Sequence, residues 1–131
     1  WPCRFQIYRK KPLVILDAAH NPAAARVLKQ TFSDLLPDRK VIFIFGVMQD
    51  KDYPQILQSL SFIAQKIILT QPKIKRAASL SELEKVVKAL KIPYEKIKSV
   101  KKAYSHALKK AAADDIICVT GSHYTLGELL A

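Results

Sequence analysis

The stretch Leu13-Val14-Ile15-Leu16-Asp17-Ala18-Ala19-His20-Asn21-Pro22 decides the fold of this chain. Its apolar first half predicts a short strand. Asn21 followed by Pro22 predicts a helix start, because asparagine is a favoured N-cap and proline fits the first helical position. Asp17 and His20 then lie at the carboxyl end of a strand and beside a helix N-terminus, where open α/β sheets bind ligands and anions are favoured. Both side chains are therefore candidate substrate contacts in an α/β fold.

Strands and helices are predicted to alternate along the rest of the chain. Residues 41–45 and 116–120 form mostly apolar, β-branched runs, which are typical of strands buried on both faces of a parallel sheet. The alternation predicts one three-layer, Rossmann-like α/β domain with a mostly parallel sheet of about six strands. The predicted strands are 5–8, 13–16, 41–45, 66–70, 94–98 and 116–120, and the predicted helices are 22–36, 53–60, one capped by Ser79 in a capping box, one capped by Ser99, and a terminal helix after 121–124. One face of the first helix is predicted to point toward the core, and it carries Ala24, Val27, Leu28, Thr31, Phe32 and Leu35.

The chain is strongly basic. Lys and Arg number 22 against 11 Asp and Glu, which gives a net charge of +11. This excess predicts an affinity for anions such as nucleic acid, an anionic membrane, or phosphorylated and polycarboxylate substrates. Because the lysines are spread over several predicted helices, solvated lysine faces explain the same excess.

Length and composition indicate a single domain. A chain of 131 residues that begins at Trp1 and ends within a predicted helix is expected to be the C-terminal piece of a longer protein. No apolar run approaches the ~18 residues of a membrane span, which argues against a membrane protein. Cys3 and Cys118 are too few for a disulfide framework and have no metal-ligand spacing, so a reduced, cytoplasmic setting is expected.

Three of the predicted strands run directly into clusters of polar residues. In a parallel sheet these strands finish on the same side, so the clusters are expected to face one ligand together. Every parallel sheet has polar loops there, so ordinary loops remain the alternative. The clusters are Asp17/His20/Asn21, Gln49/Asp50/Lys51 and Ser122/His123/Tyr124.

Each candidate residue also has a plain structural explanation. Asp17 is suited to a ribose hydroxyl or to a local cap, and His20 to a bound carboxylate or phosphate or to a hydrogen bond within its turn. Ser122 is suited to ligand contact, to capping the next helix, or to both. Lys51 is solvated unless its loop folds over the site.

Several well-known site motifs are missing from the sequence. There is no G-x-x-x-x-G-K-[ST], no G-x-G-x-x-G, no zinc-ligand spacing and no nucleophile elbow. If the domain meets ATP, it therefore contacts the nucleotide from one side only, and the phosphate-binding loop lies elsewhere.

Four segments together resemble a known family. Taken in order, they resemble the C-terminal domain of folylpolyglutamate synthase/dihydrofolate synthase, a relative of the Mur peptidoglycan ligases. The family usually has glycine in place of Cys3 and Ala18. A Cβ at position 3 can alter the turn that orients the Arg4 side chain. The four segments are Trp1-Pro-Cys-Arg-Phe5, Asp17-Ala-Ala-His-Asn-Pro22, Phe45-Gly-Val-Met-Gln-Asp-Lys-Asp52 and Thr120-Gly-Ser-His-Tyr124.

The resemblance implies a division of roles among these residues. Arg4 is expected near the phosphates of ATP and Asp17 near its ribose, whereas His20 and Ser122 hold the incoming L-glutamate or the reacting phosphate, with His20 as the catalytic residue. The further loop contacts are Asn21, Lys51 and Tyr124. The P-loop, the Mg²⁺ ligands and most of the pterin site are expected in a separate N-terminal domain, so no metal ligand is expected in this chain.

The implied reaction is carboxylate activation by ATP. The substrate carboxylate of dihydropteroate or folate takes a phosphoryl group, and the glutamate amine displaces phosphate from the mixed anhydride. Fixed cations and Mg²⁺ stabilise the charge that develops on oxygen, and this piece alone is expected to be inactive. The sequence leaves open which of the two folate activities is present.

Three alternatives remain. The first is a Mur-type ligase acting on a UDP-muramyl substrate, and the second is a purely structural domain. The third is a basic nucleic-acid-binding module. The aromatic residues argue against this alternative, because Phe43, Phe45 and Tyr104 fall mostly in predicted core positions rather than on a basic face.

Overall fold

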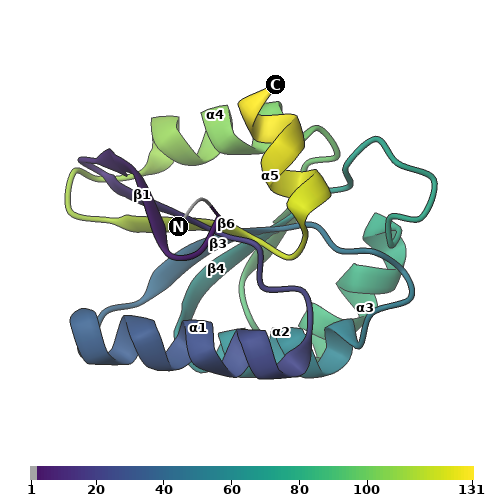
Figure 1. Cartoon of the computed structure of the whole chain (residues 1–131), viewed down its shortest axis with the longest axis horizontal. Coiled ribbons are helices and arrows are strands. Elements are labelled where there is room, and N and C mark those ends of the chain that lie inside the picture. The colour runs from purple at the N-terminus through teal and green to yellow at the C-terminus, as the bar shows by residue number, and fades with distance from the viewer. Residues whose placement is uncertain (1–2) are drawn as a thin grey trace.

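The computed structural model describes residues 3–131, so Trp1 and Pro2 of the first family segment lie outside the described residues. Strands and helices follow in the predicted order, with strand ends shifted by up to two residues (Figure 1). They are β1 (Gln6–Lys10), β2 (Leu13–Asp17), α1 (Pro22–Leu35), β3 (Val41–Phe45), α2 (Tyr53–Ser61), β4 (Ala64–Leu69), α3 (Leu80–Leu90), β5 (Tyr94–Lys96), α4 (Val100–Lys110), β6 (Ile116–Thr120) and α5 (His123–Leu130).

The strands form one six-stranded sheet in the order β1-β2-β6-β3-β4-β5. Only the β1–β2 pair is antiparallel among these described strands, which confirms the mostly parallel sheet. β6 lies in the middle of the sheet and pairs with β2 on one side and β3 on the other. The carboxyl ends of β2, β6 and β3 are therefore direct neighbours.

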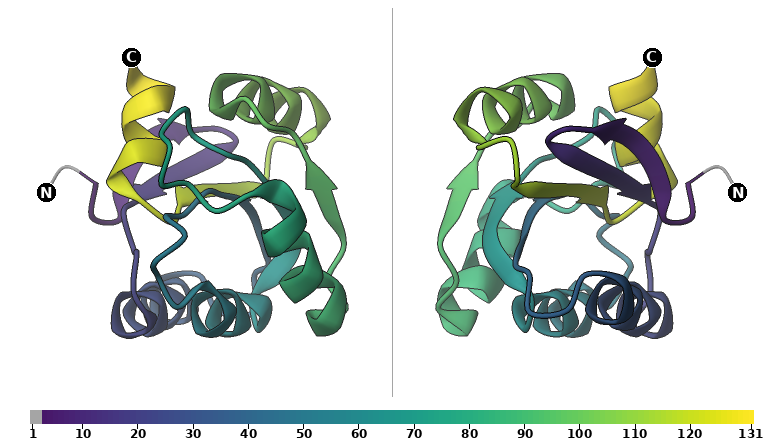
Figure 2. Two further views of the ribbon diagram at one scale, coloured as in Figure 1. Left: turned by 90° about the vertical axis from the view of Figure 1, so that its right-hand side faces the viewer. Right: turned by 90° about the vertical axis from the view of Figure 1, so that its left-hand side faces the viewer.

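Helices cover both faces of the sheet and confirm the three-layer prediction. α1, α2 and α3 lie on one face and α4 and α5 on the other (Figures 1 and 2). Each face has its own apolar core, and every residue of β3 is buried between the two cores. Burial on both faces explains why this strand is apolar along its whole length.

The predicted inward face of α1 is partly wrong. Val27 and Leu35 are 63% and 62% exposed, whereas the residues that α1 buries are Ala25, Leu28 and Phe32. Phe32 fixes this rotation of the helix, because its ring packs edge-on against Phe5 and Phe43 with centroid distances of 4.8 and 6.2 Å. The apolar stripe is narrower than the sequence periodicity suggested.

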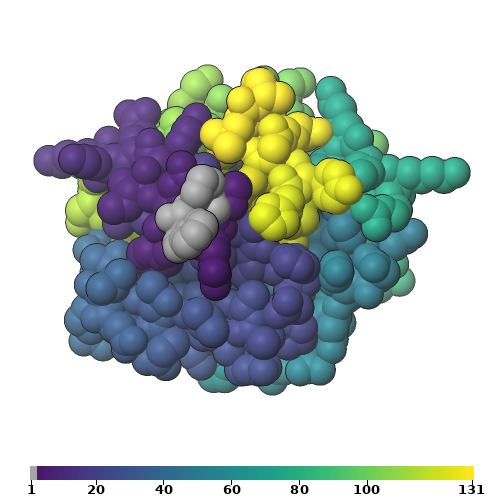
Figure 3. All heavy atoms as spheres, in the orientation of Figure 1, coloured from purple at the N-terminus to yellow at the C-terminus, as the bar shows by residue number. Residues whose placement is uncertain are grey.

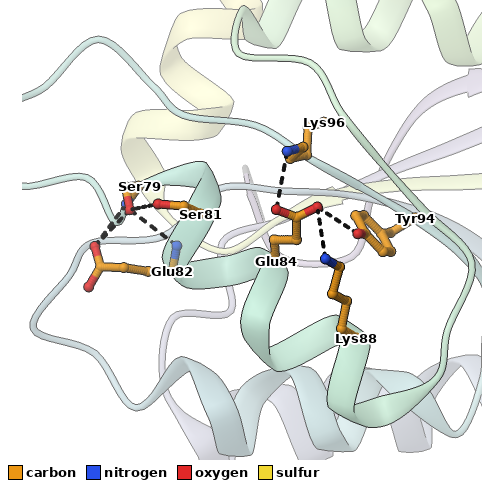
Figure 4. Close-up of polar contacts among 7 residues, drawn as sticks. All are labelled: Ser79, Ser81, Glu82, Glu84, Lys88, Tyr94 and Lys96. Carbon is orange, nitrogen blue, oxygen red and sulfur yellow. Dashed lines mark hydrogen bonds and ion pairs between the residues drawn. The ribbon is translucent and has the colours of Figure 1, made fainter.

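Polar contacts around α3 stabilise the edge of the sheet at β5 (Figure 4). The predicted capping box is present, with Ser79 Oγ accepting from the Glu82 amide and the Glu82 carboxylate accepting from the Ser79 amide, both at 3.2 Å. The Glu84 carboxylate accepts from Tyr94 Oη at 2.6 Å and from Lys96 Nζ at 3.1 Å. These bonds tie the short edge strand β5 to α3.

The opposite side of β5 is held by Glu95. Its carboxylate lies 2.7 Å from Lys66 Nζ on β4 and 2.7 Å from His106 Nε2 on α4. The hydrogen bond from Lys66 is the main cause that holds the pKa of Glu95 below its ordinary value of 4.5; partial burial opposes it, and the nearby charges of Lys66 and His106 add to it.

Replacing Glu95 by glutamine is expected to cost more stability at neutral pH than at acid pH. Because the folded-state pKa is lowered, the ion pairs stabilise the fold above the unfolded pKa, and this contribution is lost as pH falls through the folded value. The pair is one-third exposed, so we expect a loss of only about 1 kcal/mol at pH 7. Urea unfolding of both proteins at pH 7 and pH 3 measures the difference, and equal losses at the two values would contradict this account.

Candidate functional site

A hollow of about 190 Å³ lies over the carboxyl ends of the central strands. It contains residues that follow β2, β3 and β6, so each of the three predicted clusters has at least one member at this hollow. The loop after β4 also contributes. The lining residues are His20, Met48, Lys51, Arg76, Ser122, His123 and Tyr124.

His20 is held by a hydrogen bond within its own turn. Nδ1 lies 2.9 Å from the Ala18 carbonyl oxygen. Since a carbonyl oxygen only accepts, Nδ1 carries a proton in this bond, and the tautomer with a single proton has Nε2 as its acceptor. The ring also lies 5.8 Å from that of His123, centroid to centroid. The turn bond named as the alternative is thus present, and the assignment of His20 to a ligand stays a prediction.

Ser122 is the N-cap residue of α5. Its buried Oγ accepts from the Thr125 amide at 3.0 Å and lies 2.8 Å from Thr125 Oγ1. Thr125 Oγ1 donates its proton to the Gly46 carbonyl at 2.8 Å, so the Ser122 hydroxyl donates to Thr125. Ser122 therefore caps the helix and has only a lone pair left for a ligand. Its assignment to glutamate stays a prediction.

Replacing Ser122 by alanine is expected to lower the free energy of unfolding by about 1–2 kcal/mol, because the cap and a buried hydrogen bond are lost together. The matched control is Ser105→Ala on the exposed side of α4, which should change stability by less than about 0.5 kcal/mol. Chemical denaturation followed by circular dichroism compares the two variants, and equal effects would contradict the capping role.

Asp17 lies outside the hollow and holds the turn that carries Arg4. Its Oδ2 accepts from the Phe5 amide at 2.9 Å and its Oδ1 from the Ala19 amide at 3.0 Å. Burial is the main cause that raises the pKa of Asp17, against which the two backbone hydrogen bonds and the charge of Arg4 act. The local role foreseen for this carboxylate is therefore present, and Asp17 forms a corner with Arg4 rather than with His20.

The turn of residues 3–5 has an unusual backbone. Cys3 and Phe5 have φ angles of 64° and 43°, and the Cys3 carbonyl accepts from the Ala18 amide at 2.8 Å. This left-handed region favours glycine over residues that carry a Cβ. The turn nevertheless forms with cysteine there and leaves Arg4 exposed.

The remaining predicted contacts divide into two groups. Lys51 and Tyr124 line the hollow, whereas Asn21 is exposed and accepts from the Ala24 amide at 2.8 Å as the cap of α1. Gln49 and Asp50 are exposed and do not line the hollow.

Arg76 is the principal lining residue that the sequence interpretation missed. Its guanidinium donates to Tyr124 Oη at 3.1 Å and lies 5.6 Å from the centre of the Tyr124 ring. The Arg76 carbonyl accepts from the Gln49 amide at 2.7 Å, which fastens the loop after β4 to the loop after β3. The basic run 73–76 follows the predicted strand 66–70 of the same sheet and so belongs to the same edge.

The charge of the hollow suits an anion. Lys51 and Arg76 line it together with two imidazoles, and no carboxylate is among its lining residues in the described chain. Within residues 3–131 no group of three or more His, Cys, Asp or Glu side chains is arranged to bind a metal ion. None of the helices described is long and apolar enough to cross a membrane.

Comparison with known proteins places this geometry in context. The sequence profile of the Mur ligase, glutamate ligase domain matches residues 3–123. The dihydrofolate synthase/folylpolyglutamate synthase of Escherichia coli is 30% identical over 129 residues, which are 98% of this chain and 30% of that protein.

Solved structures agree with this match. The Yersinia pestis bifunctional folylpolyglutamate synthase/dihydrofolate synthase complexed with AMPPNP and Mn ion superposes with a TM-score of 0.90 and 30% identity over 99% of this chain and 30% of that one. A structure of a bifunctional synthase of this type with Mn, AMPPNP and L-glutamate bound gives a TM-score of 0.90 and 30% identity, covering 99% of this chain and 31% of that one. The chain therefore spans less than a third of the length of each of these proteins.

Proposed function

Because the chain belongs to the Mur ligase glutamate ligase domain family and is homologous to the C-terminal region of dihydrofolate synthase/folylpolyglutamate synthase, we propose that it is the C-terminal domain of a longer, ATP-dependent ligase. This enzyme adds L-glutamate to the carboxylate of dihydropteroate or of a folate. It works in the cytoplasm, where ATP and folates are available. Its P-loop domain would lie in a separate part of the protein.

The observation that carries this proposal is the cationic hollow over three neighbouring strand ends. A dicarboxylate needs fixed positive groups, and Arg76 offers a planar set of donors that matches a carboxylate. Lys51 supplies a second charge from the neighbouring loop after β3. The two side chains together would hold glutamate by its carboxylates and leave its amine free to react.

The reaction proceeds in two steps. A phosphoryl group passes from ATP to the acceptor carboxylate, which releases ADP and gives an acyl phosphate. The glutamate amine then attacks the acyl carbon, and phosphate leaves as the amide forms. His20 is the proposed base, since its Nε2 is the free acceptor at the hollow and can take the proton that the amine must lose.

The corner formed by Arg4 and Asp17 is the proposed contact for ATP. Arg4 is exposed and forms no ion pair within residues 3–131, so its guanidinium is available to phosphate oxygens. Each Asp17 oxygen accepts one backbone hydrogen bond and keeps a lone pair for a ribose hydroxyl. A bound Mg²⁺ would neutralise phosphate charge, with ligands from the P-loop domain.

The decisive experiment is glutamate-dependent ADP release by the full-length ligase, with dihydropteroate and with a reduced folate as alternative acceptors. Release that requires both glutamate and a pterin is expected, and the preferred acceptor identifies which folate activity is present. Release that ignores the pterin and requires a UDP-muramyl acceptor would overturn the folate assignment in favour of a Mur-type ligase.

A further inference from the structure

Two hydroxyls and a backbone carbonyl form a buried hydrogen-bonded chain at the start of α5. This helix, yellow in Figure 3, lies at the surface, yet Ser122 and Thr125 at its start are only 3% and 0% exposed. Ser122 Oγ lies 2.8 Å from Thr125 Oγ1, and Thr125 Oγ1 lies 2.8 Å from the carbonyl oxygen of Gly46. The chain therefore runs from the hollow, which Ser122 lines, to the residue that follows β3.

The direction of these hydrogen bonds is fixed at the Gly46 end. A carbonyl oxygen only accepts, so Thr125 donates its single hydroxyl proton to it. Thr125 Oγ1 is then the acceptor for the Ser122 proton, which points toward a residue that does not line the hollow. Ser122 Oγ also accepts from the Thr125 amide at 3.0 Å. Ser122 therefore presents one lone pair to the hollow, and no proton.

The packing around Gly46 keeps the Thr125 hydroxyl in this arrangement. A Cβ built on Gly46 would lie 2.8 Å from Thr125 Oγ1 and 2.9 Å from Pro72 Cδ, so the close approach depends on glycine. The Gly46 amide donates to the Thr120 carbonyl at 3.3 Å, which ties the end of β3 to β6. These contacts leave the Thr125 hydroxyl little freedom to turn toward another acceptor.

The charge of the hollow makes an acceptor at Ser122 useful for an amine. Lys51 and Arg76 disfavour a protonated amine beside them and favour its neutral form. The neutral amine is the form that attacks, because its lone pair forms the new bond to the acyl carbon. Its N–H groups still require an acceptor, whereas a serine proton directed at the nitrogen would occupy the lone pair that has to react.

We propose that Thr125 is a positioning residue of this site, an inference that rests on the proposed function. Thr125 holds the Ser122 proton away from the hollow, so that Ser122 accepts an N–H of the incoming glutamate amine and turns the nitrogen lone pair toward the acyl carbon. Arg76 and Lys51 take the carboxylates, and Thr125 itself touches no substrate. Its hydroxyl thereby sets the preference for glutamate over glutarate, the dicarboxylate that lacks the amine.

The test compares the equilibrium binding of glutamate and of glutarate to the full-length ligase, without ATP or a pterin. Thr125→Val keeps the shape of the side chain and removes the hydroxyl, so that Ser122 can turn its proton into the hollow. Glutamate is expected to bind about fivefold more weakly, because one hydrogen bond is lost, and glutarate at least as tightly as before. Thr125→Ser restores the hydroxyl and should restore the natural ratio of the two affinities.

The matched control is Thr70→Val. Thr70 is also fully buried and donates to a backbone carbonyl, that of Lys98, at 2.8 Å, but it does not line the hollow. Both valine variants should lower the urea midpoint of unfolding, whereas only Thr125→Val should change the affinity ratio.

Four results would each overturn the proposal. They are equal weakening of both ligands by Thr125→Val, no rescue by Thr125→Ser, the same change of ratio in Thr70→Val, and a natural ligase that does not prefer glutamate to glutarate. Binding requires no ligation, so the proposed function is judged separately, by glutamate-dependent ADP release. A ligase that releases ADP as expected but in which Thr125→Val weakens both ligands alike would refute the role of Thr125 alone.

Discussion

The substitution Gly121→Ala is expected to remove about 4 kcal/mol or more from the free energy of unfolding, a large part of the roughly 5–15 kcal/mol that is typical of a single domain. Gly121 has a φ of +113°, a conformation that residues with a Cβ rarely adopt. An added Cβ would lie 2.2 Å from the Gly46 carbonyl oxygen and 2.9 Å from its carbon. Both obstacles are backbone atoms, so relief requires the ends of β3 and β6 to separate.

The matched control is Gly127→Ala on the exposed side of α5. Nothing lies within 4 Å of a Cβ placed there, and alanine in a helix is favoured over glycine by about 0.5–1 kcal/mol. The control should therefore be slightly more stable than the natural chain. Urea unfolding measures the free energy of unfolding of both variants. If Gly121→Ala lowered it by less than about 1 kcal/mol, the two strand ends would separate at little cost and the prediction would be wrong.

The second large effect concerns Arg76, which should dominate glutamate binding. In the full-length ligase, Arg76→Ala is expected to lower kcat/KM for glutamate about 100-fold, since hydrogen bonds between a guanidinium and a carboxylate contribute about 1.5–3 kcal/mol. The loss should appear mainly as a higher KM for glutamate with an unchanged KM for ATP. Arg76 is exposed, so stability should change by less than about 0.5 kcal/mol.

Two further variants separate position from charge. Lys75→Ala makes the same charge change on an exposed neighbour that does not line the hollow, and it should leave the KM for glutamate nearly unchanged. Tyr124→Phe removes the acceptor 3.1 Å from the guanidinium, and a loss of about threefold to tenfold is expected, because one exposed hydrogen bond that positions Arg76 is lost while the cation stays. If Lys75→Ala were as damaging as Arg76→Ala, the general charge of the surface would be responsible and the specific contact would be refuted.

The sequence predicted the architecture well because its strongest signals are local. The apolar runs 41–45 and 116–120 and the corner at Asn21-Pro22 each depend on neighbours within a few residues. The helix caps at Ser79 and Ser99 are local in the same sense. Local signals of this kind predict secondary structure correctly when the tertiary structure favours the same elements, as it does here.

The parts that could not be predicted depend on contacts between distant segments. The Phe5 amide reaches the Asp17 carboxylate only because β1 folds back on β2. The residues next to Asp17 in the sequence do not indicate this structural role. Arg76 reaches the site because β4 lies beside β3, and strand order was not predicted. Val27 on α1 is exposed because Phe32 sets the rotation of that helix against the sheet.

The central place of β6 bears on how the polypeptide acquires its shape during synthesis. β2 and β3 have no direct pairing and are joined only through β6, which is translated about a hundred residues after β2. A nascent chain that has not yet released residues 116–120 from the ribosome thus holds two open strand edges with nothing between them. Such long-range pairing is slow and exposes unpaired edges to other chains. We therefore expect this domain to fold late and cooperatively, and to depend on chaperones until translation has passed β6.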